Sequence, residues 1–152
     1  MFFFIAAATF IADQVSKAAV RVLMYQGESI PVAPPVFYIT YIMNPGAAFG
    51  LLANRTPFFI AVGILLVAGV LIGYKKLPKG NNLLKYGLAL LLGGALGNLA
   101  DRLRYGRVVD FLDFRVWPVF NLADIAIVAG VCLLAWELIK GSGNKSKRDR
   151  GL

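Results

Sequence analysis

The sequence contains no histidine, a single cysteine and few charged residues, and each shortage excludes a class of protein. Without histidine, the chain can carry out neither Ser-His-Asp nor Cys-His catalysis, and it lacks the usual zinc-peptidase helix. The one cysteine, Cys132, lies inside an apolar run, so neither a disulfide framework nor a cysteine metal site is possible. Any chemistry must therefore come from carboxylates, lysine, serine or tyrosine.

Charged residues make up only 16% of the 152 residues, whereas hydrophobic residues make up 59% and the mean hydropathy is +0.70. A soluble domain typically has about 25% charged and roughly 45–50% apolar residues. The apolar residues are gathered in long runs, which predicts an integral membrane protein. The net charge of +8 is compatible with nucleic-acid binding, but the cationic residues lie at the ends of the apolar runs and in the tail. We therefore expect no nucleic-acid partner.

Four apolar segments are long enough to cross a bilayer, which needs roughly 20 helical residues for a core about 30 Å thick. These segments cover about residues 2–24, 57–74, 83–100 and 119–139. A cleaved signal peptide is the alternative for the first segment, but its start, MFFF, has neither Lys nor Arg. The second and third segments contain Gly69-x-x-x-Gly73 and Gly93-x-x-x-Gly97, a spacing that lets helices approach closely.

The distribution of basic residues predicts the orientation of these four spans. The loop KKLPKGNNLLK between spans two and three has four lysines and no acid, and the tail after Lys140 is also basic. The positive-inside rule places both on the cytoplasmic side, together with both termini. The arginines of the 101–115 loop run against this rule, although three aspartates accompany them. We expect one membrane-embedded domain over residues 1–140 and a disordered, cytoplasmic basic tail over 141–152.

The outer segment before the second span contains a predicted β-strand. In VFYITYIMN, residues 36–44, aromatic and branched residues alternate between Pro34-Pro35 and Asn44-Pro45-Gly46. Both faces of this strand are apolar or amphipathic, so we expect a small sheet on the membrane surface, where it could form a cradle over lipid or peptide. The predicted fold is thus an α-helical integral membrane protein with four transmembrane helices and a small extracytoplasmic β-sheet.

Ionisable residues near the spans are costly in a bilayer, and by default they are functional or paired. Asp13 and Lys17 are four residues apart and share a helix face, so they can form an ion pair, either purely structural or beneath an active site. Asn98 and Asp101 lie three apart at the end of the third span. Arg102 can neutralise Asp101 or reach lipid phosphates, and a simple polar helix end is the structural alternative.

Asp124 gives the strongest single signal. It lies on the same helix face as Asn121 and about two turns past Pro118, which predicts a depth of about 9 Å in the membrane. An unpartnered carboxylate there would cost several kcal/mol. Asp110 has apolar neighbours that would desolvate it, whereas Asp113 is interpreted as a solvated or arginine-paired loop residue.

Two carboxylates that lie close together in a low dielectric cannot both ionise, so one keeps its proton near neutral pH. In such a dyad, the ionised acid takes a proton from water, and the protonated acid polarises the scissile carbonyl. The sequence predicts that several aspartates converge at the outer membrane boundary. Charge and spacing alone allow Asp101 as well as Asp110 and Asp124 in the pair.

Five fragments of the chain resemble the lipoprotein signal peptidase family, signal peptidase II. They are DQVSK (13–17), NPGAAFG (44–50), GNLADR (97–102), VVDF (108–111) and FNLAD (120–124). They occur in this order along the four predicted spans, so the resemblance covers nearly the whole chain.

The resemblance implies a bacterial inner-membrane aspartyl endopeptidase that removes the signal peptide of prolipoproteins just before a diacylglyceryl-bearing cysteine. It implies that Asp110 and Asp124 are the catalytic pair. The residues that it implies for substrate binding or support of the site are Asn44, Asn98, Asp101, Arg102, Asn121, Asp13 and Lys17. We expect diacylglyceryl-prolipoprotein substrates and membrane lipids as partners, no metal or cofactor, a monomer, and an active site at the extracytoplasmic face.

Two other classes of protein remain as alternatives. A small proton-coupled transporter or channel also keeps acids within its spans, but it predicts acids near the bilayer midplane and an oligomer. A membrane scaffold or chaperone without enzymatic activity would tolerate the loss of both Asp110 and Asp124.

Overall fold

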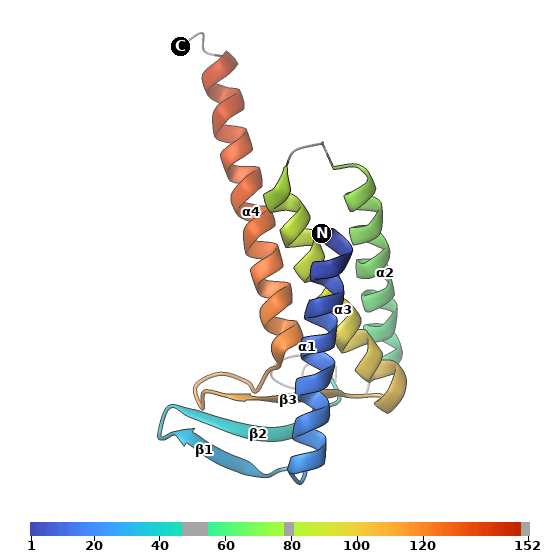
Figure 1. The fold of residues 1–152 in the computed structure, drawn as a ribbon, viewed down its shortest axis with the longest axis vertical. Coiled ribbons are helices and arrows are strands. Elements are labelled where there is room, and N and C mark those ends of the chain that lie inside the picture. The colour runs from blue at the N-terminus through green and yellow to red at the C-terminus, as the bar shows by residue number, and fades with distance from the viewer. Residues whose placement is uncertain (47–54, 78–80, 150–152) are drawn as a thin grey trace.

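The computed structural model describes residues 1–46, 55–77 and 81–149, which form a helical bundle with a small sheet at one end (Figure 1). The helices are α1 (Phe2–Leu23), α2 (Thr56–Lys75), α3 (Asn82–Tyr105) and α4 (Leu122–Asp149). Within these ranges, four helices are long and apolar enough to cross a membrane. The predicted fold class, four spans and a small sheet, is therefore confirmed.

Helix α3 lies at the centre of the bundle and contacts the other three helices. Close approach to α1 depends on glycine, because a Cβ atom at Gly93 would lie 2.6 Å from the carbonyl oxygen of Ala6. Gly97 is equally crowded, so the predicted close packing at this pair of glycines is confirmed. The same prediction for α2 is wrong. A Cβ at Gly69 would meet no atom within 4 Å, and one at Gly73 would only reach ordinary contact distance.

The sheet has three antiparallel strands in the order β1 (Ser29–Ala33), β2 (Phe37–Asn44) and β3 (Val108–Asp113). Strand β2 confirms the strand predicted over residues 36–44. Strand β3 corrects the predicted loop over 101–115, because α3 continues to Tyr105 and Val108 already begins a strand. Pairing of β2 with β3 brings Ile42 opposite Asp110, so the sheet places an acid next to the helices.

Helix α4 begins later than predicted. The span expected from residue 119 starts at Leu122, with Asn121 just before it, so Asp124 lies in the first helical turn. The helical geometry assumed from Pro118 onward is therefore wrong, because residues 118–121 are not helical and Phe120 bridges to Leu112 of the sheet. Asp124 thus lies at the end of the bundle beside the sheet.

At its other end, α4 continues as helix to Asp149, where the sequence analysis predicted a disordered tail from residue 141. A helix that is already formed is extended at little cost per residue, which favours its continuation past Lys140. The N-terminus of α1 and the C-terminal part of α4 both lie toward the end of the bundle that is opposite the sheet (Figure 1).

Candidate active site

The N-terminus of α4 is closed by a reciprocal pair of hydrogen bonds between Asn121 and Asp124. The backbone N–H of Asp124 donates to Oδ1 of Asn121 at 3.0 Å, and the backbone N–H of Asn121 donates to Oδ2 of Asp124 at 3.1 Å. This is a capping box, which satisfies two backbone donors and fixes both side chains. The other oxygen of Asp124 accepts a hydrogen bond of 2.7 Å from Nδ2 of Asn98 on α3.

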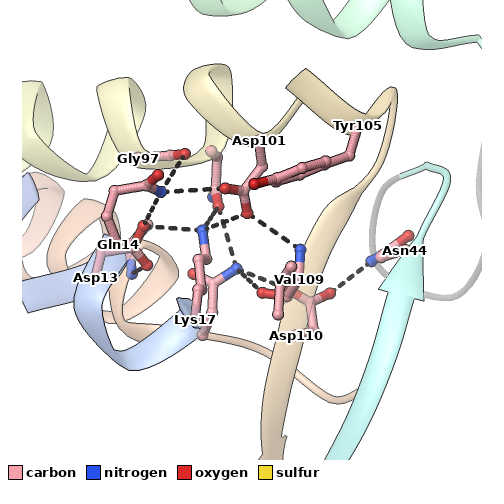
Figure 2. Close-up of polar contacts among 12 residues, drawn as sticks. Asp13, Gln14, Lys17, Asn44, Gly97, Asp101, Tyr105, Val109 and Asp110 are labelled. Atoms are coloured by element: carbon pink, nitrogen blue, oxygen red, sulfur yellow. Dashed lines mark hydrogen bonds and ion pairs between the residues drawn. The ribbon is translucent and has the colours of Figure 1, made fainter. Parts of the chain in front are cut away.

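Asp110 enters the same region from strand β3 and is only 3% exposed. Its Oδ1 accepts a hydrogen bond of 2.6 Å from Nδ2 of Asn121. Its Oδ2 accepts one of 2.9 Å from Nδ2 of Asn44, at the end of β2, as Figure 2 shows. Asn121 therefore contacts both acids, although one comes from the sheet and the other from a helix.

Asp110 and Asp124 line one cavity of about 170 Å³ between the sheet and the ends of α3 and α4. Its polar lining consists of residues that the sequence analysis singled out, namely Asn44, Asn98, Arg102, Asp110 and Asp124. The loop before α4 closes one side with Trp117, Pro118, Val119 and Phe120. Of the candidate acids, Asp101 does not line this cavity.

The environment of Asp110 raises the pKa of its carboxyl from 3.8 to about 7. Burial is the main cause, and the nearby charge of Asp124 adds to it. The hydrogen bonds from Asn44 and Asn121 and the charge of Lys17 oppose this shift without cancelling it. Near neutral pH, this site therefore holds a carboxyl group that can gain or lose a proton.

Beneath the cavity, Lys17 on α1 is the centre of a buried polar network (Figure 2). Its Nζ lies 2.9 Å from Asp13 and 3.0 Å from Asp101, which confirms the predicted pairing with Asp13. The same atom donates to Oδ1 of Asn98 at 2.9 Å. One cation thus pairs with two buried acids and orients the amide that contacts Asp124.

The two acids of this network also bind backbone groups at the edges of the site. Oδ1 of Asp13 accepts from the N–H of Ala123 at 3.0 Å, at the N-terminus of α4. Oδ2 of Asp101 accepts from the N–H of Val109 at 3.1 Å, next to Asp110. Asp13 and Asp101 therefore position the two elements that carry the cavity acids.

Sequence reasoning missed one residue of the network, Gln14. Its Nε2 contacts Asp13 at 3.1 Å and Asp101 at 3.1 Å (Figure 2). It follows Asp13 directly in the fragment DQVSK, and its polarity within an apolar span was the available signal.

Of two further polar residues in the 101–115 segment, Arg102 lines the polar cavity and Asp113 does not. Arg102 donates to the carbonyl oxygen of Gly46 at 3.2 Å and packs over the ring of Phe59. Asp113 lies away from the cavity and is buried on β3, not solvated in a loop, but its predicted ion pair with Arg115 is present at 3.5 Å. Although burial raises the pKa of Asp113, hydrogen bonds from Thr40 and Arg115 outweigh it and hold that pKa below its usual range.

A second, apolar cavity of about 610 Å³ adjoins the first. It shares Trp117, Phe120 and Asp124 with the polar cavity and continues along α4 past Ile125, Val128 and Ala129. An acid of the polar site thus lies at the mouth of a space suited to a hydrocarbon chain.

Among the described ranges, no group of three acidic or cysteine side chains is arranged to hold a metal ion. The polar cavity therefore offers a pair of carboxyl groups, amide donors and one arginine. This set can activate a water molecule and stabilise negative charge on a carbonyl oxygen.

Comparison with known proteins agrees with this arrangement. The family model for signal peptidase II matches residues 5–140. The lipoprotein signal peptidase of Pelotomaculum thermopropionicum is 62% identical, over 97% of this chain and 97% of its own length. That of Moorella thermoacetica is 51% identical, over 96% of this chain and 97% of its own length. A solved structure of a bacterial membrane enzyme superposes with a TM-score of 0.90 at 35% identity, over 95% of this chain and 90% of that one. The chain therefore belongs to the signal peptidase II family, the lipoprotein signal peptidases.

Proposed function

We propose that the chain is an aspartyl endopeptidase that cleaves diacylglyceryl-modified prolipoproteins just before the lipidated cysteine. Membership of the family makes it a membrane-bound signal peptidase of bacterial lipoprotein maturation. The observation that carries the finer proposal is the pair Asp110 and Asp124, which line one cavity and are joined through Asn121.

The two acids have different surroundings, which suit different roles. Asp124 lies at the N-terminus of α4, where the helix dipole and two N–H donors stabilise a negative charge. Asp110, with its pKa raised to about 7, holds the proton. Each carboxyl oxygen has two acceptor positions, so Asp110 can carry this proton and still accept from Asn44 and Asn121.

In the proposed reaction, Asp124 takes a proton from a water molecule while the water oxygen attacks the scissile carbonyl carbon. Asp110 donates its proton to the carbonyl oxygen, which gives a neutral tetrahedral diol. The proton on Asp124 then passes to the cysteine nitrogen as the carbon–nitrogen bond breaks, and a diol proton returns to Asp110. Both acids regain their initial protonation states.

The apolar cavity beside Asp124 supports a lipid-bearing substrate. Its lining contributes almost no polar surface, and it runs along the outer side of α4, so a diacylglyceryl chain can lie there while the peptide bond meets the acids. With the lysine-rich loop and both termini in the cytoplasm, the sheet and the cavity face the extracytoplasmic side. We propose that a single copy of the chain carries the complete site, because both acids and their partners belong to one chain.

Cleavage of a diacylglyceryl-modified prolipoprotein by the purified protein in detergent tests this proposal. Signal-peptide release is followed by gel shift for the wild type and for Asp110→Asn and Asp124→Asn. Each substitution should lower kcat roughly 10²–10⁴-fold, because it removes a general acid or base. Asp113→Asn is the matched control, since Asp113 lies on the same strand as Asp110 but outside the cavity.

Asp101→Asn tests the alternative dyad, in which Asp101 takes the place of Asp110. The folded fraction of this variant should still cleave, because Asp101 contacts Lys17 and the Val109 backbone and does not line the cavity. If Asp110→Asn cleaves and folded Asp101→Asn does not, the dyad is assigned to the wrong residue. If the wild type leaves intact a substrate that a control enzyme cuts, the peptidase proposal fails and a transporter becomes the better candidate.

A further inference from the structure

A second polar cavity, of about 100 Å³, lies between the last turns of α1 and α3 and has no part in the proposed reaction. Its polar lining consists of Gln14, Lys17, Arg21, Asp101, Arg104 and Tyr105. Neither Asp110 nor Asp124 lines it. Three of these side chains are cationic and one is acidic, so the cavity carries a net positive charge.

The uncompensated charge belongs to two arginines. Lys17 already pairs with two acids, Asp13 and Asp101, and with the two arginines the group still carries a net charge of about +1. Within residues 1–46, 55–77 and 81–149, in contrast, no carboxylate lies within ion-pair distance of Arg21 or Arg104.

Both guanidinium groups are held in place by neutral partners. Arg21 donates to the hydroxyl of Tyr105 and packs over its ring at 4.1 Å, and Arg104 donates to Oε1 of Gln14 at 3.0 Å. A guanidinium has five N–H donors, so most of them remain available to an incoming anion. Planar N–H pairs of this kind match the oxygens of a phosphate group.

Stabilisation of the helix dipoles accounts for only part of this arrangement. Arg21 and Arg104 each lie in the last turn of a helix, where a cation is favourable. That effect explains one basic residue on each helix, but it does not require the two side chains to converge on one cavity. Both arginines also lie at the end of the bundle that the positive-inside rule expects to be poor in basic residues.

An apolar cavity lies about one helical turn from this cluster, on the side away from the sheet. It has a volume of about 200 Å³ and is lined by Phe10, Leu96, Leu99, Ala100 and Leu103. Phe10 precedes Gln14, and Ala100 precedes Arg104, by four residues, which places each pair on one helix face one turn apart. The seam between α1 and α3 therefore has a cationic part near the sheet and an apolar part farther into the bundle.

We propose that this seam binds an anionic phospholipid, with the phosphate held by Arg21 and Arg104 and an acyl chain in the cavity at Phe10. Basic pockets between transmembrane helices bind lipid headgroups by this chemistry. The site is separate from the dyad cavity, so it does not depend on the proposed reaction.

Native mass spectrometry of the full-length protein in detergent tests the site. The probes are dioleoylphosphatidylglycerol and dioleoylphosphatidylcholine, added in equal amounts. The wild type should retain phosphatidylglycerol about tenfold over phosphatidylcholine, and Arg21→Gln/Arg104→Gln should lose this preference. Lys75→Gln/Lys76→Gln is the control, because it removes the same charge at the opposite end of the bundle.

Inorganic phosphate distinguishes a lipid from a soluble anion. At a lipid site, millimolar phosphate leaves the retained phosphatidylglycerol unchanged. If phosphate displaces the lipid and raises the apparent Tm of the wild type but not of the glutamine variant, the same arginines bind a free phosphate, which overturns the lipid proposal. Equal lipid preference in the wild type and the glutamine variant, or its loss in the lysine control as well, also overturns the proposal.

Folding of each variant is checked by gel filtration and helical circular dichroism. If the glutamine variant does not fold, Arg21→Lys/Arg104→Lys replaces it, because lysine keeps the charge but lacks the planar pair of donors. Its lipid preference should fall at least threefold, and an undiminished preference would contradict binding through the guanidinium groups.

Discussion

Asn121 contacts both acids of the proposed dyad, through three different groups. Its backbone N–H and Oδ1 bind Asp124, while its Nδ2 donates to Asp110. A residue that is completely buried and held through its backbone and both side-chain polar atoms has little freedom to move. The relative position of the two carboxyl groups is therefore fixed before substrate arrives, as general acid–base catalysis requires.

The pKa of Asp110 predicts the alkaline limb of the pH profile. Because this pKa is raised to about 7, the carboxyl is protonated below that pH and ionised above it. If Asp110 donates the proton, kcat/KM for a diacylglyceryl-prolipoprotein should fall about tenfold per pH unit above pH 7. Initial rates of cleavage at low substrate concentration, measured from pH 5 to 9, check this limb.

Asp113→Asn is the control for this profile. Asp113 lies on the same strand, but its pKa is held below the usual range, so it stays ionised over this pH range and its replacement should leave the limb in place. A rate that rises through pH 7 and continues to rise toward pH 9 would show that Asp110 acts in its ionised form.

Replacement of Lys17 should destabilise the folded protein. Lys17→Met leaves Asp13 and Asp101 buried and without their cation, and the loss of one partner from a buried ion pair typically costs about 3–5 kcal/mol. The apparent Tm in detergent should therefore drop well below that of the wild type. Thermal unfolding followed by circular dichroism measures this change.

A triple variant tests the cause of that loss. Lys17→Met combined with Asp13→Asn and Asp101→Asn removes all three charges, so it should recover part of the lost apparent Tm. An apparent Tm of Lys17→Met equal to that of the wild type would contradict the neutralising role of Lys17.

At the scale of elements, the sequence predicts the helices better than the sheet. Each long apolar run became a helix, because the bilayer favours a helix over any open structure. The expected bounds are close for α1 and α2, whereas α3 and α4 continue past their expected ends. Strand β3 was missed because VVDFLD is short and contains two acids. It becomes a strand through pairing with β2, which is about 70 residues earlier in the chain. Such distant pairing leaves no local pattern.

In the candidate site, too, the sequence predicts some features and not others: it identifies residues, but not their long-range contacts. Most polar residues of the dyad cavity and the pair Asp13 and Lys17 could be named, because polar side chains are conspicuous in apolar runs. Asn44 was named only from the family resemblance. The contacts of Asp101 could not be predicted, since they depend on how α3 meets α1 and β3 in space. Likewise, the place of Asp124 in the first turn of α4 could not be predicted, because it depends on where that helix begins.

Close packing of α1 against α3 predicts a difference between two glycines. Gly93→Ala should lower the apparent Tm strongly, since the new methyl group would lie 2.6 Å from the backbone of Ala6. Gly69→Ala should be neutral or slightly stabilising, because its Cβ meets no atom and alanine favours a helix by about 1 kcal/mol over glycine. Thermal unfolding of both variants measures the difference. An equal effect of the two changes would contradict the close helix contact.

At the scale of the whole molecule, two cavities of different character meet at Asp124. The polar cavity lies against the sheet, and the apolar cavity runs along α4. A lipid-modified peptide likewise has a polar peptide bond next to an apolar hydrocarbon chain. The arrangement of the bundle and the sheet thus matches the substrate that we propose.

The apolar cavity predicts a defect in binding without a defect in chemistry. Val128→Trp should fill part of the cavity and raise KM for the diacylglyceryl substrate about tenfold, because the loss of two buried methylene groups costs about 1.6 kcal/mol. The kcat should change little, since Val128 does not line the polar cavity. Steady-state cleavage kinetics separate the two constants.

Val131→Trp is the matched control for this prediction. Val131 is also an exposed valine of α4, but it does not line the apolar cavity, so KM should stay near the wild-type value. An equal rise of KM in both variants would point to a general effect of tryptophan on α4.

The bond from the N–H of Ala123 to Asp13 connects α4 to α1, 110 residues apart in the sequence. During synthesis, α1 enters the membrane long before α4 has been translated, so at that stage it can form only its own ion pair between Asp13 and Lys17. The remaining partners arrive with α3 and α4. A ribosome-bound chain therefore cannot bring the two cavity acids together until α4 has been inserted beside α1 and α3.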